Sequence, residues 1–281
     1  MRRLAVFLIS VTVIVCGCSI ADSGRQGNGE LDRAVLPIQP PASTPVTEMD
    51  ARNVETPNRF VIEAPAGAPN IVIVLIDDIG FGATSTFGGP IETPTFDRLA
   101  RQGLRFNRFH TTALCSPTRA ALLTGRNHHA VNVGSVMEVA TGFPGNQGER
   151  PDNAKYVAET LRMNGYSTAA FGKWHETAPW EVSVSGPFFR WPTNSGFDKF
   201  YGFIGGETNQ WDPVIFDGVT RVPKKDDPDY HFTTDMTDEA IAWMERKHKQ
   251  MQSAAEEDAN HLYRYHANLG TFLVHQWLRQ G

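Results

Sequence analysis

The stretch Asn70-Ile71-Val72-Ile73-Val74-Leu75-Ile76, followed by Asp77-Asp78, decides the fold that this sequence predicts. Its run of apolar, mostly β-branched residues is unbroken, which is typical of a parallel strand covered on both faces. We therefore expect a strand over residues 70–76 in the middle of a sheet. The predicted fold class is α/β, with a mostly parallel central sheet and helices on both of its faces.

Two carboxylates, those of Asp77 and Asp78, stand at the carboxyl end of this expected strand. Ligands of open α/β sheets bind at the carboxyl ends of the strands. Adjacent carboxylates repel each other unless a cation lies between them, and hard divalent cations prefer oxygen ligands. The pair therefore indicates a site for calcium or magnesium. A strand-ending turn with two solvated acids is the simpler alternative.

The second informative stretch is Leu114-Cys115-Ser116-Pro117-Thr118-Arg119-Ala120-Ala121-Leu122-Leu123-Thr124-Gly125-Arg126. Pro117 suits the first turn of a helix, and Gly125 suits its carboxyl-terminal stop. Cys115 then lies at or just before the helix N-terminus, where backbone N–H groups favour an anion. Arg119 follows one turn later and can reach the same anion. The pattern predicts a nucleophile beside a tetrahedral group such as sulfate or phosphate; a buried structural cysteine beside a surface arginine is the alternative.

A third stretch, Gly172-Lys173-Trp174-His175, follows a strand that we expect over residues 166–171. Residues two apart on an extended chain point to the same side, so Lys173 and His175 share a face. A lysine there can neutralise an anion, and a histidine can move a proton near neutral pH. The alternative is a surface lysine beside a half-buried histidine.

The remaining segments of the body predict elements to which we give a structural role. Helices are expected over residues 93–103 and 154–164 and from residue 233 onward. We also expect a strand over residues 104–109, a hairpin around Asp217-Gly218 and an apolar helix after residue 266. Helices alternate with strands in this order, as in an α/β domain.

The amino-terminal segment has the pattern of an export signal. A basic start is followed by an apolar run over residues 4–15, which is too short to span a bilayer. The run ends at a box in which Cys18 resembles the lipidated cysteine of bacterial lipoproteins. We therefore expect a signal peptide over residues 1–18 and an exported protein, either periplasmic or anchored to the membrane by a lipid; an uncleaved signal that serves as the anchor is a further alternative. Residues 19–68 are rich in Gly, Pro, Ser and Thr and predict a linker.

Cysteine count and charge narrow the function classes further. The chain of 281 residues has 3 cysteines, and Cys16 and Cys18 lie in the expected signal. Cys115 then has no partner for a disulfide in the exported body, and a lone cysteine there needs another explanation. The net charge is −5 and no basic stripe is present, so nucleic acid is not an expected partner.

Taken together, the three stretches resemble the type I sulfatases, whose signature is Cys-x-Pro-Ser/Thr-Arg followed by an apolar run and Thr-Gly-Arg. The chain has this signature from Cys115 to Arg126, with the family's Asp-Asp at residues 77–78 and its Gly-Lys-Trp-His at residues 172–175. The resemblance implies an alkaline phosphatase-like fold and a sulfuric ester hydrolase of the arylsulfatase type. Its substrate would be a small-molecule sulfate ester.

The resemblance also implies a role for each site residue. Cys115 would be oxidised to formylglycine by a formylglycine-generating enzyme, and the hydrate of the aldehyde would be the nucleophile. Arg119 would steady this group, Lys173 would contact the substrate sulfate, and His175 would orient or deprotonate the hydrate. Asp77, Asp78 and residue 115 would bind the metal, calcium or magnesium.

The resemblance covers residues 69–248 and is absent from the tail, residues 249–281. The family's second acidic metal pair and a further lysine have no counterpart there. We therefore expect a chain truncated at the carboxyl end, and the missing ligands leave its own activity open. Two other functions stay open: a phosphate or phosphonate ester hydrolase of the same superfamily, and a non-catalytic surface lipoprotein that binds anions or partners.

Overall fold

The computed structural model describes residues 31–42, 45–56, 60–65, 67–257 and 268–276. The expected signal peptide, with Cys16 and Cys18, lies outside the described residues, so export and lipidation stay predictions. In the part of the chain that is described, no helix is long and apolar enough to cross a membrane.

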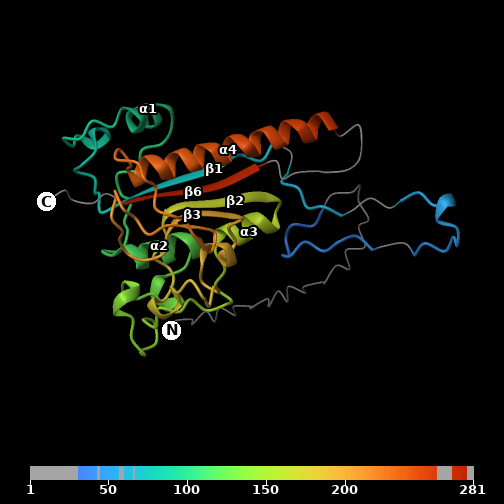
Figure 1. The fold of residues 1–281 in the computed structure, drawn as a ribbon, viewed down its shortest axis with the longest axis horizontal. Coiled ribbons are helices and arrows are strands. Elements are labelled where there is room, and N and C mark those ends of the chain that lie inside the picture. The colour runs from blue at the N-terminus through green and yellow to red at the C-terminus, as the bar shows by residue number, and fades with distance from the viewer. Residues whose placement is uncertain (1–30, 43–44, 57–59, 66, 258–267, 277–281) are drawn as a thin grey trace, which may run out of the picture. The chain divides into compact units, whose positions relative to one another are not determined.

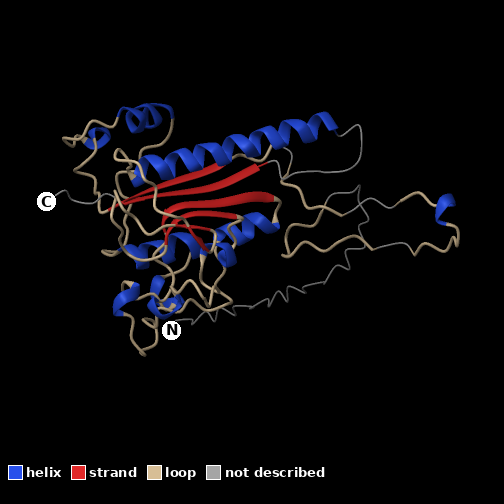
Figure 2. Ribbon diagram, in the orientation of Figure 1, coloured by secondary structure: helices blue, strands red, loops and turns tan. Residues whose placement is uncertain are grey.

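A six-stranded sheet forms the centre of the structure, in the strand order β1-β6-β2-β3-β4-β5 (Figures 1 and 2). Neighbours among β1, β6, β2 and β3 are parallel, whereas β4 and β5 are antiparallel additions. The prediction of a mostly parallel sheet is therefore confirmed. The strands are β1 Ile71–Asp77, β2 Tyr166–Lys173, β3 Lys199–Phe203, β4 Phe216–Asp217, β5 Thr220–Arg221 and β6 Asn268–Gln276.

Strand β1 lies at the edge of this sheet, so the expectation of a central strand covered on both faces is wrong. It pairs only with β6 among the described strands. Val72 and Val74, which alternate with better-buried residues, are 51% and 49% exposed. The apolar run predicted the strand correctly, but it does not show which other strands and helices pack against β1.

Strand β6 corrects the expectation of an apolar helix after residue 266. Residues 268–276 pair with β1 on one side, from Ile71 opposite Gly270 to Asp77 opposite Gln276. On the other side they pair with β2, where Tyr166 lies opposite Asn268. Periodicity alone does not separate a helix from a strand in so short an apolar run. The tail therefore supplies a strand in the interior of the sheet.

Helices cover both faces of the sheet, as expected. Helix α4 (Phe232–Glu257) lies on one face, and helices α2 (Cys115–Thr124) and α3 (Val157–Met163) lie on the other (Figure 1). Alternate residues of a strand point to opposite faces of a sheet, so a buried strand such as β2 needs helices on both sides.

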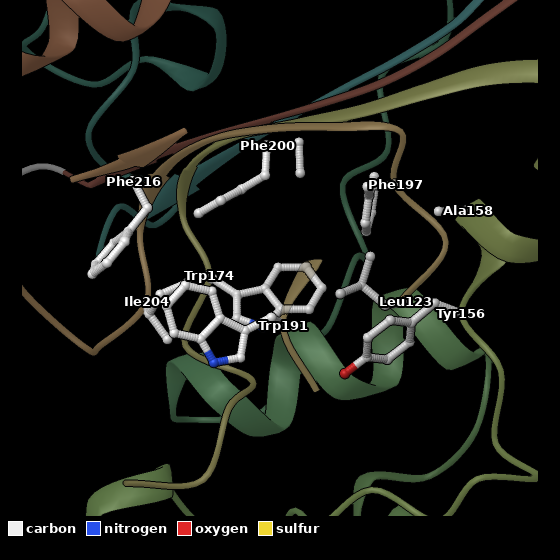
Figure 3. Packing of buried hydrophobic residues seen from close by; sticks show 10 residues of the cluster. Leu123, Tyr156, Ala158, Trp174, Trp191, Phe197, Phe200, Ile204 and Phe216 are labelled. Carbon is white, nitrogen blue, oxygen red and sulfur yellow. The ribbon is translucent and has the colours of Figure 1, made fainter. Parts of the chain in front are cut away.

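Two buried clusters join β2 to these helices. Ala169 and Phe171 pack in the cluster that includes Met236 and Trp243 of α4. Ala170 packs in the other cluster, which contains Leu123 of α2 with Tyr156, Trp174, Trp191 and Phe200 (Figure 3). Every residue of β2 is buried. The strand that leads to Lys173 is therefore held from both faces.

Helix α1 (Pro94–Gln102) and the residues after it are much less buried. The expected helix over residues 93–103 is confirmed, but none of its residues is buried. Residues 104–109 form no strand, and Leu104, Phe106 and Phe109 are 84%, 64% and 64% exposed. The alternating pattern was misleading because no strand pairs with this segment in the described chain. The expected hairpin is confirmed as β4 and β5, with Gly218 at φ 62° in its turn.

Part of the expected linker packs against the domain. Arg33 donates hydrogen bonds to the carbonyl oxygens of Glu63, at 2.5 Å, and Asn164, at 3.2 Å. Gly165 has φ 88°, and a Cβ atom there would collide with the backbone of Glu63. The described linker residues contain only one 3-10 helix, Ala51–Asn53. The other 3-10 helices are Ser85–Phe87, His128–Val131, Met137–Val139, Pro179–Glu181 and Pro192–Ser195.

Candidate active site

The candidate site begins at the N-terminus of α2. Cys115 is the first residue of this helix, and Leu114 at the N-cap offers no side-chain hydrogen bond to the first turn. The first N–H groups of a helix have no partner within it, so they are available to an anion. Cys115 is partly exposed, whereas Arg119, one turn later, is 2% exposed. Gly125 ends the helix in the left-handed conformation, at φ 65°, as its position predicted.

A buried cluster of charges connects α2 with the ends of β1 and β2. The Nζ atom of Lys173 lies 2.5 Å from Oδ2 of Asp77, and Nη2 of Arg119 lies 3.4 Å from the same oxygen. Arg119 Nη1 also donates a 2.8 Å hydrogen bond to the carbonyl oxygen of Lys173. All three side chains are less than one-tenth exposed. Two cations therefore share one carboxylate beside residue 115, which leaves positive charge for an anionic ligand.

The ionisation of Arg119 reflects this environment. Burial lowers the pKa of its guanidinium, and the negative charge of Asp77 acts in the opposite direction. An arginine remains charged even when its pKa is lowered from 12.5. Arg119 is therefore a fixed positive charge of the site.

His175 is held from several sides. Its backbone has φ 57°, and its N–H group donates to the carbonyl oxygen of Ile204 at 3.0 Å. Its Nε2 atom lies 2.7 Å from Oε2 of Glu138, and the side chain is 4% exposed. A Cβ atom on Gly206 would lie 2.8 Å from the imidazole ring, so a larger residue at this position would displace the ring. A positive φ is uncommon outside glycine, and here the surrounding contacts maintain it.

Glu138 is a residue that sequence reasoning missed. It lies on the 3-10 helix Met137–Val139, and its side chain is 52% exposed. Partial burial alone would raise the pKa of Glu138, but the hydrogen bond with His175 and the nearby positive charges outweigh it and lower the pKa below 4.5. The only signal in the sequence is an acidic residue within an otherwise apolar segment.

The thiol of Cys115 is activated by its neighbours. Its pKa is lowered from 9.0 to about 7, first by the nearby imidazole of His175 and then, against a smaller effect of burial, by the charge of Lys173. Within the described residues, no hydrogen bond of standard geometry joins Cys115 to His175, and Nδ1 of His175 has no partner. The imidazole therefore acts on residue 115 at longer range, and Nδ1 is available to another group.

A second buried acid, also missed from the sequence, lies near Arg119. Glu176 is fully buried and accepts a 3.0 Å hydrogen bond from the hydroxyl of Tyr156. Arg150 lies over the ring of Tyr156, 4.3 Å from its centroid. Burial raises the pKa of Glu176 well above 4.5, and the charges of Arg119 and Arg150 oppose this rise. Glu176 is thus a buried acid whose charge, when present, acts on Arg119 in addition to that of Asp77.

The end of β1 offers a poorer environment for a cation than the sequence suggested. Asp78 is exposed, has φ 57°, and makes no hydrogen bond or ion pair with any residue that the structure describes. Oδ2 of Asp77 is already shared by Lys173 and Arg119. Across the described ranges, no group of three or more His, Cys, Asp or Glu residues is arranged to hold a metal. These residues do not fit a divalent cation, and metal binding by Asp77, Asp78 and residue 115 stays a prediction.

The structure thus brings together most of the predicted site residues. Asp77, Arg119 and Lys173 are in direct contact, and Cys115 and His175 lie close enough for their charges to interact. Asp78 is adjacent to this group in sequence but takes no part in its contacts. Geometry alone leaves the chemical role of each residue a prediction.

Comparison with known proteins shows which family the sequence matches. Residues 69–264 match the family model described as Sulfatase, which extends past the predicted boundary at residue 248. Human arylsulfatase A is 41% identical over 141 residues, covering 50% of this chain and 26% of that protein. An arylsulfatase of Klebsiella aerogenes is 31% identical over 149 residues, covering 52% of this chain and 30% of that protein. The chain therefore spans between a quarter and a third of the length of these relatives.

A solved structure supports the same fold. The crystal structure of Ps i-CgsB has a TM-score of 0.51 at 23% identity and covers 75% of this chain and 45% of that one. At this identity the likeness concerns the fold alone. The α/β sheet with helices on both faces is thus that of the alkaline phosphatase-like sulfatases. Sulfatases generally use a formylglycine residue and a divalent metal ion.

Proposed function

Because the chain belongs to the sulfatase family, we propose that it carries a site for hydrolysing sulfate esters of the arylsulfatase type. The observation that supports this most directly is the arrangement around residue 115. Cys115 starts α2, while the buried cations of Arg119 and Lys173 share only one carboxylate, that of Asp77. A tetrahedral sulfate monoanion fits the surplus positive charge and the free N–H groups of the helix N-terminus.

We propose further that Cys115 is the residue converted to formylglycine by a formylglycine-generating enzyme. The partly exposed side chain at a helix N-terminus, surrounded by Arg119, Lys173 and His175, fits an aldehyde hydrate. When present, the hydrate supplies one hydroxyl that attacks sulfur and a second that lets sulfate leave. The overall reaction adds one water to the ester and gives an alcohol or phenol and sulfate.

The residues of this chain have distinct tasks in the proposed reaction. Arg119 and Lys173 bind the sulfate oxygens and stabilise the negative charge that develops on them, because buried, fixed charges act strongly in a site that excludes water. Asp77 holds both cations in place through its Oδ2 atom. His175 accepts a proton at Nδ1, the buried ring nitrogen that lacks a partner in the described chain.

Calcium is the metal that we propose for the family's site, with magnesium as the alternative. Ca²⁺ takes about 6–8 oxygen ligands. Asp77 and Asp78 offer too few, and Lys173 already occupies Oδ2 of Asp77. No step of the reaction is therefore assigned to the metal in this chain, and the carboxylate pair is at most part of a site.

The proposed function can be tested on the full chain produced together with a formylglycine-generating enzyme. Mass spectrometry of the tryptic peptide Phe109–Arg119 should show an aldehyde in place of the thiol. The protein should then hydrolyse 4-nitrophenyl sulfate faster than 4-nitrophenyl phosphate or a phenylphosphonate ester, and Cys115→Ala should abolish the reaction. Faster phosphate or phosphonate hydrolysis would support the second function, and an unmodified, inactive chain would support a non-catalytic binding protein.

A further inference from the structure

His175 is the one proposed acid–base group of the site, and its ring is fixed by two contacts that the reaction outlined above does not use. Glu138 Oε2 lies 2.7 Å from Nε2. Gly206 approaches the same edge of the ring, where a Cβ atom would lie 2.8 Å from both Cε1 and Nε2. Nδ1 is buried and has no partner among the described residues. One ring nitrogen is therefore engaged and the other is free.

We propose that Glu138 is a positioning residue, which keeps the proton of neutral His175 on Nε2 and leaves Nδ1 as the proton acceptor of the site. A carboxylate accepts hydrogen bonds and does not donate them, so the group bonded to Glu138 must be N–H. The partner of one imidazole nitrogen sets the protonation of the other. This role rests on the proposed function, because a reaction at residue 115 is what makes the free nitrogen useful.

The surroundings of Glu138 favour this role over an incidental surface contact. Its side chain is 52% exposed, yet its carboxylate makes a short, charge-assisted bond to a group that is 4% exposed. The structure gives that carboxylate no other side-chain partner among the residues it describes. Since surface ion pairs contribute little to stability, Glu138 contributes more to the orientation of the ring than to the fold.

The same loop offers a matched control. Glu149 follows eleven residues later, and its side chain is 45% exposed. Its carboxylate accepts from Nε1 of Trp180 at 3.0 Å and lies 3.6 Å from Arg190, away from the proposed reaction. Replacing Glu138 or Glu149 with alanine removes the same group from a similar surface, but only the first removes the partner of His175.

The first test is independent of catalysis. The full chain, labelled with ¹⁵N in the histidine rings, is examined by ¹H–¹⁵N correlation spectroscopy at pH 9, where imidazole is ordinarily neutral. We expect a protected, downfield ring N–H signal from Nε2, assigned by its loss in His175→Asn. Glu138→Ala should lose this signal and Glu149→Ala should keep it. A proton found on Nδ1 in the wild type, or an unchanged signal in Glu138→Ala, would overturn the proposal.

The second test uses the formylglycine-containing enzyme. Glu138→Ala should lower kcat by about 10- to 100-fold, the range known for carboxylates that orient metal-bound histidines, and leave KM within about twofold. Glu138→Asp should recover part of the loss, and Glu149→Ala should behave like the wild type. Equal kcat values for Glu138→Ala and Glu149→Ala would contradict the role. If the wild type hydrolyses no sulfate ester, the proposed function fails, while the spectra still decide the position of the proton.

Discussion

Strands β1 and β2 end at the same site, but their surroundings are opposite. Strand β2 is buried along its whole length, and both Lys173 and His175 at its end are less than one-twentieth exposed. Strand β1 lies at the sheet edge and ends in buried Asp77 followed by exposed Asp78. The half of the site that we propose to bind an anion and move a proton is therefore well buried in the described chain, whereas the half expected to bind a cation is not.

The largest expected change in unfolding free energy is the difference between replacing Asp77 and replacing Asp78. Asp77→Asn leaves Lys173 and Arg119 buried without a countercharge, which should cost about 3–5 kcal/mol of unfolding free energy. Asp78→Asn changes an exposed residue whose positive φ suits asparagine, so its effect should stay within about 0.5 kcal/mol. Urea denaturation measures both. Equal losses would show that the ends of the two strands are not as different as their burial indicates.

A second pair of variants tests how tightly each strand end is packed. A Cβ atom on Gly202 of β3 would collide with the backbone of Gly172 in β2, so Gly202→Ala should destabilise the fold by about 3 kcal/mol. Gly82, in the loop after β1, has no atom near the position of a Cβ, so Gly82→Ala should be almost neutral. The same denaturation experiment applies. A tolerated Gly202→Ala would contradict the close approach of β2 and β3.

The lowered pKa of Cys115 predicts a pH dependence in the unconverted thiol form. Since the pKa is about 7 rather than 9.0, the thiolate is present above pH 7 and is lost below it. His175→Ala removes the main cause of the shift and should reduce alkylation by iodoacetamide at pH 7 by about tenfold. Mass spectrometry of peptide 109–119 isolates Cys115 from the other thiols. His231→Ala is the control, because His231 packs against Trp211 instead.

An unchanged alkylation profile in His175→Ala would show that the imidazole does not act on the thiol.

The lowered pKa of Cys115 also makes the free energy of unfolding depend on pH. A group whose pKa is lowered by folding contributes stability above its unfolded value, and this contribution is lost as the pH falls through the folded value. For Cys115 the window runs from about pH 9 down to about pH 7.

The smallest expected change in unfolding free energy is the one caused by adding Ca²⁺. With Asp77 engaged by two cations and Asp78 exposed, Ca²⁺ should bind with a dissociation constant of about 1 mM or weaker. At 1 mM Ca²⁺ the unfolding free energy should then rise by at most about 0.4 kcal/mol relative to EDTA. A rise of about 3 kcal/mol would show a complete metal site and would remove the contrast between the two strand ends.

Sequence reasoning predicted which candidate site residues lie together better than it predicted their surroundings. Cys115 and Arg119 were identifiable because a proline and a glycine mark the ends of α2, which fixes where both residues lie. Lys173 and His175 were identifiable because a buried strand precedes them. Glu138 was missed because its partner is 37 residues away, and because a three-residue 3-10 helix and the loop after β2 are too short to show a periodic pattern.

The errors in the fold have a common physical origin. The edge position of β1, the missing strand at residues 104–109 and the strand at residues 268–276 all depend on which segments pair with each other. Pairing is decided by contacts between distant parts of the chain, and local patterns do not record it. Helix α2, whose ends depend on neighbouring residues, was therefore predicted more accurately than the order of the strands.

The position of β6 between β1 and β2 determines the order in which the strands can pair during synthesis. Among the described strands, β6 comes last in the sequence, yet it lies between β1 and β2, so these two strands do not pair with each other. During synthesis the first strand must wait for nearly two hundred further residues before its neighbour exists, and such long-range pairing is slow. The pairing that brings the end of β1, with Asp77, close to Lys173 can therefore form only after residue 276 has been added, long after the residues of the helix that begins at Cys115.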